Sequence, residues 1–590
     1  MKNKVLIIGI DSLDPKIINK LISKLPNFKS LETFTELETT IPPETPVAWS
    51  AASTGTNPGK YGIFDFISRD LENNQPKLNL TTEKAGIIKI EYTCAMRGIP
   101  FWRILTQNDI PTTIIRWPVT FPPEKIKGHM LSGLGVVDAK GMLNNYYFYT
   151  DKEIKEDEEG KEKIIPIKIE DNTIETYISG PLIRKKEGIT DKRISMNIEI
   201  KDNKIEIHID KKDYIIKNKE WSEIIRIKFK ILPFIDYYGI FNIYLQSIKP
   251  FEMYISSIQI DPENQFLDIT YPKDYGKELV NNIGLFYTLG MPEDTKAVTE
   301  NRLNKEAFIQ QIFQIEKERR KMFFYEFEKF NEGVYAFIFD EGDRLQHIFW
   351  ENSSKEGELK IPREIEEYYI RKDKFLGEVL SKLDNDTKLI IFSDHGFGNF
   401  KKQVNINSWL VKEGYLKTKG NKKDLLFKFV DWNDTRAYSI GFTSLYINLK
   451  DREKLGIVKK EEYEILVNEI INKLKNLQDN GLPVFTNLYK GKEVYKGEYS
   501  YLAPDIVLGF SQGYRMSWKN AIGALDSDII SNNDGKWQGD HLIDRSHVPG
   551  VLFTNFKINK KNPDLKDIAP TILKICDVKI PESIEGQSLI

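Results

Sequence analysis

The sequence predicts an α/β fold in which a mostly parallel sheet is flanked by helices and carries a β-rich insertion. Apolar, strand-like runs alternate with helical stretches in the first 137 residues and again after about residue 275. This alternation is typical of parallel strands joined by helices. Between about residues 138 and 265, apolar and polar residues alternate instead, which indicates hairpins and other paired strands.

Residues 1–137 are predicted to form the first part of the core. The run VLIIGI (5–10) is a buried strand, because its apolar residues are followed at once by a charge. Helices are predicted for PKIINKLISKL (15–25), TPVAWSAASTG (45–55) and PFWRILTQN (100–108), and a second strand for TTIIRW (112–117).

Residues 138–265 are predicted to form the β-rich insertion. The segment ISMNIEIKDNKIEIHID (194–210) alternates apolar and polar residues around a central Asp-Asn pair, which predicts a hairpin. Further strands are predicted for IIRIKFKIL (224–232), FNIYLQSI (241–248) and MYISSIQI (253–260).

Residues 266–404 are predicted to form the second part of the core. A long helix (304–330), the strand VYAFIFD (334–340), a helix (363–383) and the strand TKLIIFS (387–393) follow one another here. Residues 405–535 are predicted to form a mixed α+β region near the site. Residues 536–590 close the core with the helix LKDIAPTILKICDV (565–578).

Composition excludes several functional classes. The 85 Lys and Arg residues nearly balance the 87 Asp and Glu residues, so no specific binding of nucleic acid is expected. Two cysteines, Cys94 and Cys576, are too few for a disulfide framework or a cysteine zinc site. The six-residue N-terminal apolar run is too short for a signal peptide, and Asp236 interrupts the most apolar later stretch. We therefore expect a cytoplasmic protein with no membrane span.

Polar residues suited to metal binding follow the predicted strands. In open α/β sheets, ligands bind outside the carboxyl ends of the strands, so residues placed there are expected to converge. The candidates are Asp11, Thr45, Asp343, His347, Asp394 and His395, with His541 or His547 as a further imidazole. Three carboxylates, three imidazoles and a hydroxyl are enough to hold two divalent metals and a nucleophile, which predicts chemistry at phosphorus.

Each candidate also has a structural interpretation. Asp11 and Thr45 both suit the start of a helix, where they would act as N-caps. Asp343 and His347 have the i, i+4 spacing of a surface ion pair, although the same spacing lets one helical face bind one ion. Asp340 and Glu341 are nearby alternatives to Asp343. Asp394 and His395, directly after a buried strand, are the sharpest local signal, and their structural interpretation is a buried Asp-His pair.

In this order, the motifs GIDSLD, TPVAWSAASTGTNPGKYGIFDF, DRLQHIFW, SDHGFG and GDHLID resemble the alkaline phosphatase superfamily. The similarity is greatest to its type I phosphodiesterase/nucleotide pyrophosphatase branch, and implies an alkaline-phosphatase-like core with two zinc-type ions. By this resemblance one ion would be bound by Asp11, Thr45, Asp394 and His395, and the other by Asp343, His347 and His541.

The resemblance also bears on two details of the site. It favours His541 over His547, because the last ligand of the family follows a Gly-x-His pattern. The family usually has PxxHGI after the nucleophile helix, whereas this chain has PGKYGI with Tyr61. That position is outside the ligand set, so the departure concerns the surroundings of the site.

The implied activity is metal-dependent hydrolysis of a phosphodiester or pyrophosphate in a small molecule, through a phospho-threonine on Thr45. The ligand set suits Zn²⁺, with Mn²⁺ or iron as substitutes. A phosphomonoesterase or a phosphoglycerate-mutase-like phosphotransferase stays open, although no arginine closely follows Thr45; Arg116 or Arg344 would serve only if the fold brings them near. An inactive binding or scaffold protein is the third alternative. Oligomeric state is not predicted.

Overall fold

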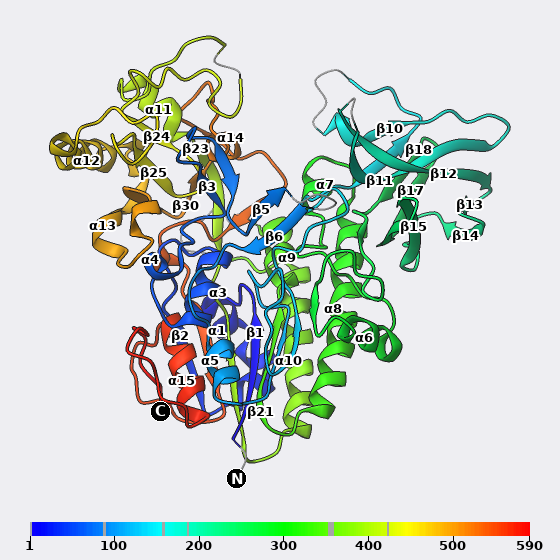
Figure 1. The fold of residues 1–590 in the computed structure, drawn as a ribbon, viewed down its shortest axis with the longest axis horizontal. Coiled ribbons are helices and arrows are strands. Elements are labelled where there is room, and N and C mark those ends of the chain that lie inside the picture. The colour runs from blue at the N-terminus through cyan, green and yellow to red at the C-terminus, as the bar shows by residue number, and fades with distance from the viewer. Residues whose placement is uncertain (1–2, 86–89, 156–159, 186–187, 352–358, 422–423) are drawn as a thin grey trace. The chain divides into compact units, whose positions relative to one another are not determined.

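The computed structural model describes residues 3–85, 90–155, 160–185, 188–351, 359–421 and 424–590. The chain forms two compact units, which are described separately below (Figure 1). The first unit comprises Met1–Thr113 and Asn331–Ile590, and the second comprises Ile114–Phe330. In the described part of the chain, no helix has the length and apolar character needed to cross a membrane.

A mostly parallel sheet forms the centre of the first unit. Strand β1 (Lys4–Ile10) lies between β21 (Gly333–Phe339) and β22 (Thr387–Phe392) and is parallel to both. Val5 to Ile10 are buried, as expected of a parallel strand that is covered on both faces. On the far side of β22, β33 (Gly550–Thr554) and then β2 (Thr33–Leu37) continue the sheet with antiparallel pairing. The predicted fold class is thus confirmed.

Helix α3 (Thr45–Thr54) is a fully buried helix near the site. All ten of its residues are buried, and it packs against α5 (Phe101–Gln107) and α15 (Ile568–Ile575) (Figure 1). Gly9 lets α3 also lie close to β1, because a Cβ at this position would be 2.3 Å from Cη2 of Trp49. The strand end and the start of α3 are therefore held close together.

Other helices and short strands complete this part of the first unit. Helix α9 (Glu341–Phe349) directly follows β21. The remaining elements are α1 (Pro15–Leu21), α2 (Pro26–Lys29), α4 (Pro58–Tyr61), β3 (Ile67–Arg69), β4 (Pro76–Leu78), β5 (Thr81–Ala85), β6 (Ile90–Cys94), β7 (Thr112–Ile115) and α10 (Arg363–Lys382).

Residues after His395 build smaller sheets with their own hydrophobic core. The elements are β23 (Gly398–Val404), α11 (Ile406–Lys412), β24 (Ala437–Ser439), β25 (Ser444–Ile447), α12 (Lys460–Lys475), β26 (Gln478–Asp479), β27 (Leu482–Pro483), β28 (Phe485–Lys490), α13 (Gly491–Val494), β29 (Ile506–Phe510), β30 (Gly513–Met516), α14 (Trp518–Ala521), β31 (Ile530–Asn532) and β32 (Gly539–Asp540). The short strand β32 pairs with β23, with Gly398 opposite Asp540. This pairing brings the segment that contains His541 next to the chain that follows His395.

The second unit is rich in β-structure. Its strands are β8 (Gly128–Leu131), β9 (Tyr147–Thr150), β10 (Ile164–Pro166), β11 (Thr173–Lys185), β12 (Gly188–Lys201), β13 (Lys204–Ile209), β14 (Lys212–Lys217), β15 (Ile225–Leu232), β16 (Ile235–Phe241), β17 (Ile243–Ile248), β18 (Phe251–Ile255), β19 (Gln259–Ile260) and β20 (Thr270–Tyr271). Helices α6 (Tyr275–Ile283), α7 (Thr295–Thr299) and α8 (Lys305–Lys329) follow.

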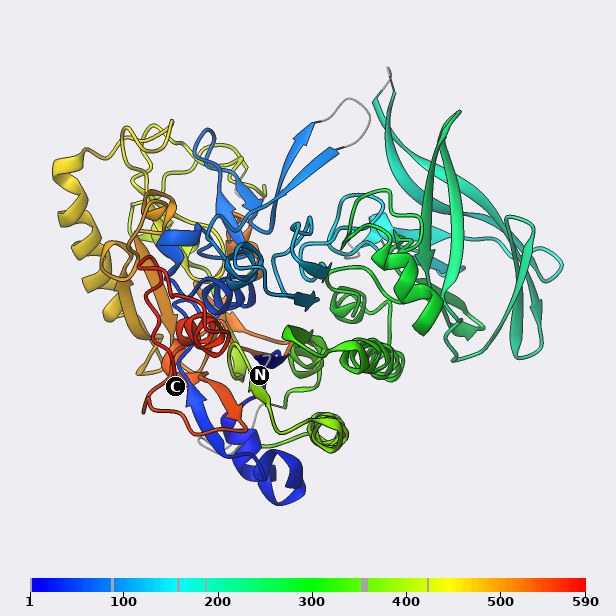
Figure 2. The same cartoon turned by 60° about the horizontal axis from the view of Figure 1, so that its bottom comes forward.

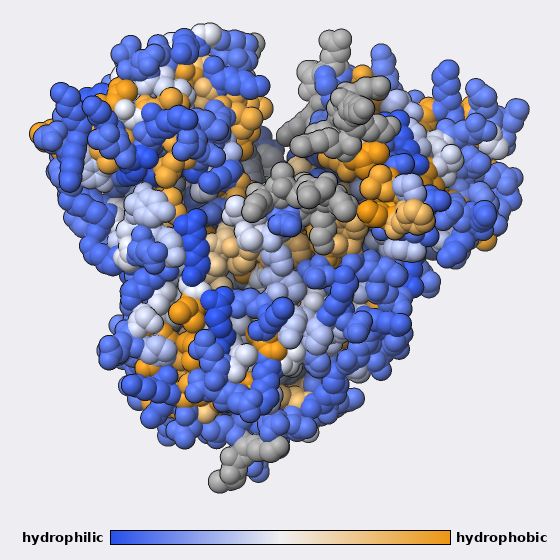
Figure 3. All heavy atoms as spheres, in the orientation of Figure 1, coloured by the Kyte–Doolittle hydropathy of each residue, from blue (hydrophilic) through white to orange (hydrophobic). Residues whose placement is uncertain are grey.

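The predicted hairpin at residues 194–210 is confirmed as β12 and β13, with Lys201 opposite Lys204 across the turn. Strands β11 to β14 form one antiparallel sheet, whose long, twisted strands are visible in Figure 2. On the face of the molecule drawn in Figure 3, hydrophilic residues predominate and apolar residues form smaller groups.

Candidate metal centre

Asp11 lies at the carboxyl end of β1, where its backbone N–H donates to the carbonyl of Phe339 (2.9 Å). Its carboxylate is fully buried and does not cap a helix. Helix α1 is instead capped by Asp14, whose Oδ1 accepts hydrogen bonds from the N–H groups of Lys16 (2.7 Å) and Ile17 (3.2 Å). The carboxylate of Asp11 is therefore left to interact with the neighbouring strand ends.

Asp394 and His395 follow β22, the strand beside β1, and both are fully buried. His395 Nε2 lies 3.1 Å from Asp394 Oδ2 and 3.8 Å from Asp11 Oδ1. One possible ligand atom from each of the three residues lies within 4.8 Å of the other two. We refer to Asp11, Asp394 and His395 as the Asp11 group.

Thr45 is the first residue of α3 and contacts the Asp11 group. Its Oγ1 lies 3.3 Å from His395 Nε2. The N-cap position belongs to Glu44, whose side chain makes no capping hydrogen bond. The Thr45 hydroxyl is thus directed at the imidazole at the N-terminus of a buried helix.

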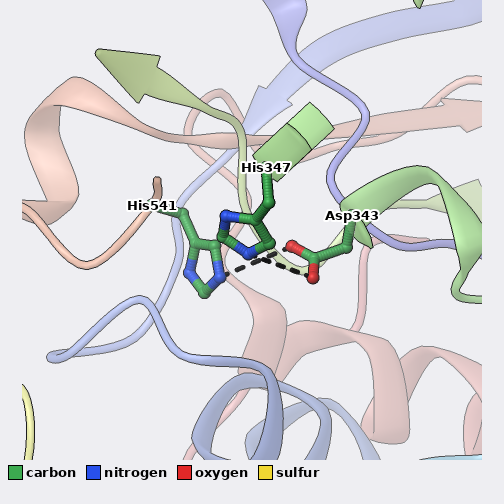
Figure 4. Close-up of side chains that lie close together, drawn as sticks. All are labelled: Asp343, His347 and His541. Carbon is green, nitrogen blue, oxygen red and sulfur yellow. Dashed lines mark ion pairs between the residues drawn. The ribbon is translucent and has the colours of Figure 1, made fainter. Parts of the chain in front are cut away.

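A second cluster, the Asp343 group, consists of Asp343, His347 and His541 (Figure 4). Asp343 and His347 lie one turn apart on α9, and His541 follows β32. The two imidazoles contact different oxygens of one carboxylate: His347 Nε2 lies 3.2 Å from Oδ2, and His541 Nε2 lies 3.4 Å from Oδ1. Here too, one possible ligand atom per residue lies within 4.8 Å of the others.

Backbone carbonyls orient both imidazoles of the Asp343 group. Nδ1 of His347 lies 2.8 Å from the carbonyl oxygen of Gly539, and Nδ1 of His541 lies 2.7 Å from that of Pro43. Because a carbonyl only accepts hydrogen bonds, the proton sits on Nδ1 and Nε2 of a neutral ring is free for ligation. Burial lowers the pKa of His541 to about 3, so this ring is neutral at ordinary pH.

His547 lies apart from both groups. Its Nε2 is 2.8 Å from Oγ1 of Thr486, and the side chain is partly exposed. The chemistry of the sequence did not decide between His541 and His547. The structure brings His541 to the site.

The electrostatics of the two groups fit divalent cations. Burial raises the pKa of Asp11 well above its usual range, and the carboxylates of Asp394 and Asp343 raise it further. Burial also raises the pKa of Asp343, but His347 and Arg344 outweigh this effect and hold it well below the usual range. Asp394 Oδ2 is buried, and among the described residues its close polar neighbour is His395 Nε2 at 3.1 Å. Buried carboxylate oxygens beside imidazole nitrogens are a donor set that suits a divalent metal.

Of the two arginines considered from the sequence, Arg344 contacts the site. Its Nη1 lies 3.5 Å from Asp343 Oδ2 and 4.0 Å from Asp11 Oδ2, and it donates to the carbonyl of Asp340 (2.9 Å). Arg116 lies in the second unit, where Nη2 donates to the carbonyls of Leu289 (3.4 Å) and Gly290 (3.3 Å). Arg344 thus faces the carboxylates of both groups.

Several residues at the site were not predicted. The ring of Trp537 stacks on His347 with centroids 3.7 Å apart, and its Nε1 donates to Asp540 Oδ2 (2.7 Å). Arg515 Nε lies 2.7 Å from the same oxygen. The only local signal for Asp540 is its position before His541, and no spacing pattern marks the tryptophan or the arginine.

Tyr61, the departure from the family pattern, packs against α3. It is fully buried, and its hydroxyl donates to the carbonyl of Val47 in α3 (2.7 Å). Tyr61 therefore supports the helix that begins with Thr45.

The family model of type I phosphodiesterases / nucleotide pyrophosphatases matches residues 5–195 and 267–539, well over half of the chain. The chain therefore belongs to the type I phosphodiesterase/nucleotide pyrophosphatase family, within the alkaline phosphatase superfamily that its motifs resemble. This membership supports a hydrolase that acts on phosphodiester or pyrophosphate bonds.

Solved structures of similar fold include human ectonucleotide pyrophosphatase/phosphodiesterase 5, with 10% identity over 99% of this chain and 97% of that chain and a TM-score of 0.43. The murine protein covers 98% of this chain and 96% of its own at 10% identity, with a TM-score of 0.41. An inactive variant of the murine protein in complex with AMP has the same identity and coverage, with a TM-score of 0.43. No curated protein sequence matches the chain.

Proposed function

We propose that this protein hydrolyses a phosphodiester or pyrophosphate bond of a small-molecule substrate, with Thr45 as the nucleophile and two divalent metal ions as cofactors. The observation that carries the proposal is the position of Thr45 Oγ1, 3.3 Å from His395 Nε2 at the start of α3. A hydroxyl at a helix N-terminus beside a metal-type cluster is placed for attack on phosphorus.

In this proposal each of the two groups would hold one metal ion. Asp11, Asp394, His395 and Thr45 would hold one ion, and Asp343, His347 and His541 would hold the other. When bound, Zn²⁺ or Mn²⁺ would supply positive charge that lowers the pKa of an alcohol and stabilises a leaving oxygen.

Thr45 would carry the phosphoryl group between two in-line steps. In the first, Oγ1 releases its proton to solvent and bonds to phosphorus, while the bond from phosphorus to the leaving oxygen breaks and that oxygen keeps the electron pair. In the second, water attacks the same phosphorus and loses a proton, the bond to Oγ1 breaks, and Oγ1 takes up a proton, which restores the threonine. The positive end of α3 favours the negative charge that develops on Oγ1 during both steps.

The surroundings of Arg344 favour a diester over a monoester. A monoester dianion needs a positive group that is free to bind it, whereas Arg344 faces the carboxylates of Asp343 and Asp11. Its charge is thus partly compensated by residues of the site. This supports a substrate with a single negative charge on the reacting phosphate.

The test compares Thr45→Ala with the matched variant Thr45→Ser, which keeps a hydroxyl. Hydrolysis of bis-p-nitrophenyl and mono-p-nitrophenyl phosphate is measured with added Zn²⁺ or Mn²⁺, and metal content by elemental analysis. We expect about two metals in the wild type, preference for the diester, and loss of about 10³-fold or more in Thr45→Ala with partial activity in Thr45→Ser.

Three results would contradict parts of this proposal. Undiminished turnover by Thr45→Ala would remove the threonine from the mechanism. Preference for the monoester would favour the phosphomonoesterase or mutase-like alternative. No bound metal and no turnover of either ester would favour a binding or scaffold protein.

A further inference from the structure

Ser12 lies between the two metal-type groups. Its Oγ is 3.0 Å from Asp11 Oδ1 and 2.8 Å from Asp343 Oδ1, and His395 Nδ1 lies 3.5 Å away. The residue is fully buried. One hydroxyl therefore contacts members of both groups, although no feature of the sequence marks it as functional.

The hydroxyl has a single proton to share between two carboxylates. A serine hydroxyl donates one hydrogen bond, and an ionised carboxylate only accepts. At any moment Ser12 can therefore donate to only one of the two carboxylates, Asp11 or Asp343. The lone pairs of its oxygen then face the second carboxylate. A carboxylate that ligates a cation is a weaker acceptor, so the proton then turns towards the other carboxylate. Occupancy of one group would therefore fix the carboxylate of the other.

The backbone of Ser12 has a conformation that residues other than glycine rarely adopt. Its φ is +66°, in the left-handed region that favours glycine. The carbonyl of Ser12 accepts from Nε2 of Gln346 on α9 (2.8 Å), and its N–H lies 3.4 Å from Asp394 Oδ1. Both backbone groups are tied to the elements that carry the two clusters. A strained residue held in this way at a site points to a role for its side chain.

We propose that Ser12 is a positioning residue that links the two groups, so that the two metals bind cooperatively. The inference rests on the proposed two-metal function, and it assigns to this chain a direct connection between its metal sites. Removal of the hydroxyl is expected to weaken binding of each ion and to abolish the effect of one ion on the other.

The structure supplies variants that separate this role from a structural one. Ser12→Gly removes the hydroxyl and relaxes the backbone, because glycine adopts positive φ without steric cost. Ser12→Ala removes the hydroxyl and keeps the strain. Ser53→Ala is the matched control: it deletes a buried hydroxyl of α3 that donates to the carbonyl of Ser50 (3.0 Å) and contacts neither group.

The experiment is calorimetric titration of the metal-free full-length protein with Zn²⁺, together with its thermal unfolding. We expect metal-free Ser12→Gly to unfold at or above the temperature of the wild type, yet to bind Zn²⁺ about 10-fold or more weakly. Ser12→Ala should lose affinity equally, and Ser53→Ala should keep it. If Ser12 had a purely structural role, Ser12→Gly would be at least as stable as the wild type and would keep its affinity for Zn²⁺.

Cooperativity is tested by adding His347→Ala, which removes a member of the Asp343 group. In the wild-type background, this change should weaken the binding of the remaining ion. In the Ser12→Gly background, the affinity for the remaining ion should not change further. If Ser12→Gly binds two ions as tightly as the wild type, the inference is wrong while the proposed function stands. If the wild type binds no Zn²⁺ or Mn²⁺, the two-metal function fails and the inference fails with it.

Discussion

His395 and His541 lie face to face, with ring centroids 3.7 Å apart and an angle of 11° between the rings. One ring belongs to the Asp11 group and the other to the Asp343 group, so the two clusters form one continuous centre. Burial lowers the pKa of His541 to about 3, and the charge of His395 contributes to this shift. At least one ring of the stack is thus neutral, as a metal ligand must be.

Metal removal should destabilise the protein. Without a cation, the carboxylates of Asp11, Asp343 and Asp394 remain buried close together, which raises the pKa of Asp11. An ion that binds only the folded state adds about 3 kcal/mol at 100 times its Kd. We expect a chelator to lower the melting temperature by several degrees, and added Zn²⁺ or Mn²⁺ to restore it. Calorimetry checks this, and an unchanged melting temperature would show that neither group holds a metal.

His541 and His547 form a natural pair for mutation. His541→Ala removes an imidazole whose Nε2 lies 3.4 Å from Asp343, so we expect loss of one of two ions and of about 10²-fold or more in turnover. His547→Ala removes only a contact with Thr486 and should retain both ions. Elemental analysis of the two purified variants checks the prediction. Loss of an ion from His547→Ala alone would reverse the assignment.

Arg515 and Asp540 form a buried ion pair next to the Asp343 group, with Nε 2.7 Å from Oδ2 and both side chains almost fully buried. Arg515→Met would leave the charge of Asp540 without its partner, which typically costs about 3–5 kcal/mol. The double variant with Asp540→Asn should recover part of this loss, because it removes the uncompensated charge. Denaturant unfolding of the single and double variants measures the difference. Equal losses in both variants would contradict the pairing.

Asp138 should make the second unit less stable as pH rises. Burial raises the pKa of Asp138 from 3.8 to about 6. The folded state therefore binds this proton more tightly than the unfolded state. The contribution of Asp138 to the free energy of unfolding is thus greatest below about pH 4. It falls by about 2–3 kcal/mol as pH rises through 6.

Asp138→Asn isolates this effect, because the amide oxygen can still accept from the N–H groups of Lys140 (2.8 Å) and Met142 (3.0 Å). The variant should match the wild type near pH 4 and exceed it above pH 7. Unfolding measured across this pH range provides the check. A constant difference between the two proteins would show that Asp138 does not titrate in this window.

Local sequence patterns were sufficient to predict the strand ends of the core. β1 and β22 end in apolar runs that an acidic residue soon follows, which is why Asp11 and Asp394 could be proposed from position. Asp343 lies four residues beyond β21, and its i, i+4 spacing with His347 was the signal that predicted it. The predicted boundaries were less accurate where an α-helix continues as a 3₁₀ helix. The predicted helix 15–25 is α1 (Pro15–Leu21) followed by a 3₁₀ turn (Ile22–Lys24), because hydrophobic spacing alone does not distinguish the two.

The sequence by itself determined the fold class, the hairpin of the insertion and the residue types of the centre, since each depends on the burial and chemistry of neighbouring residues. Only the tertiary structure decided which groups meet. The pairing of β32 with β23 brings His541 to His395, and the left-handed turn at Ser12 places its hydroxyl between Asp11 and Asp343. The contacts of His395 with His541 and of Ser12 with Asp343 join residues more than 140 positions apart, and they depend on how packed elements align rather than on any local pattern.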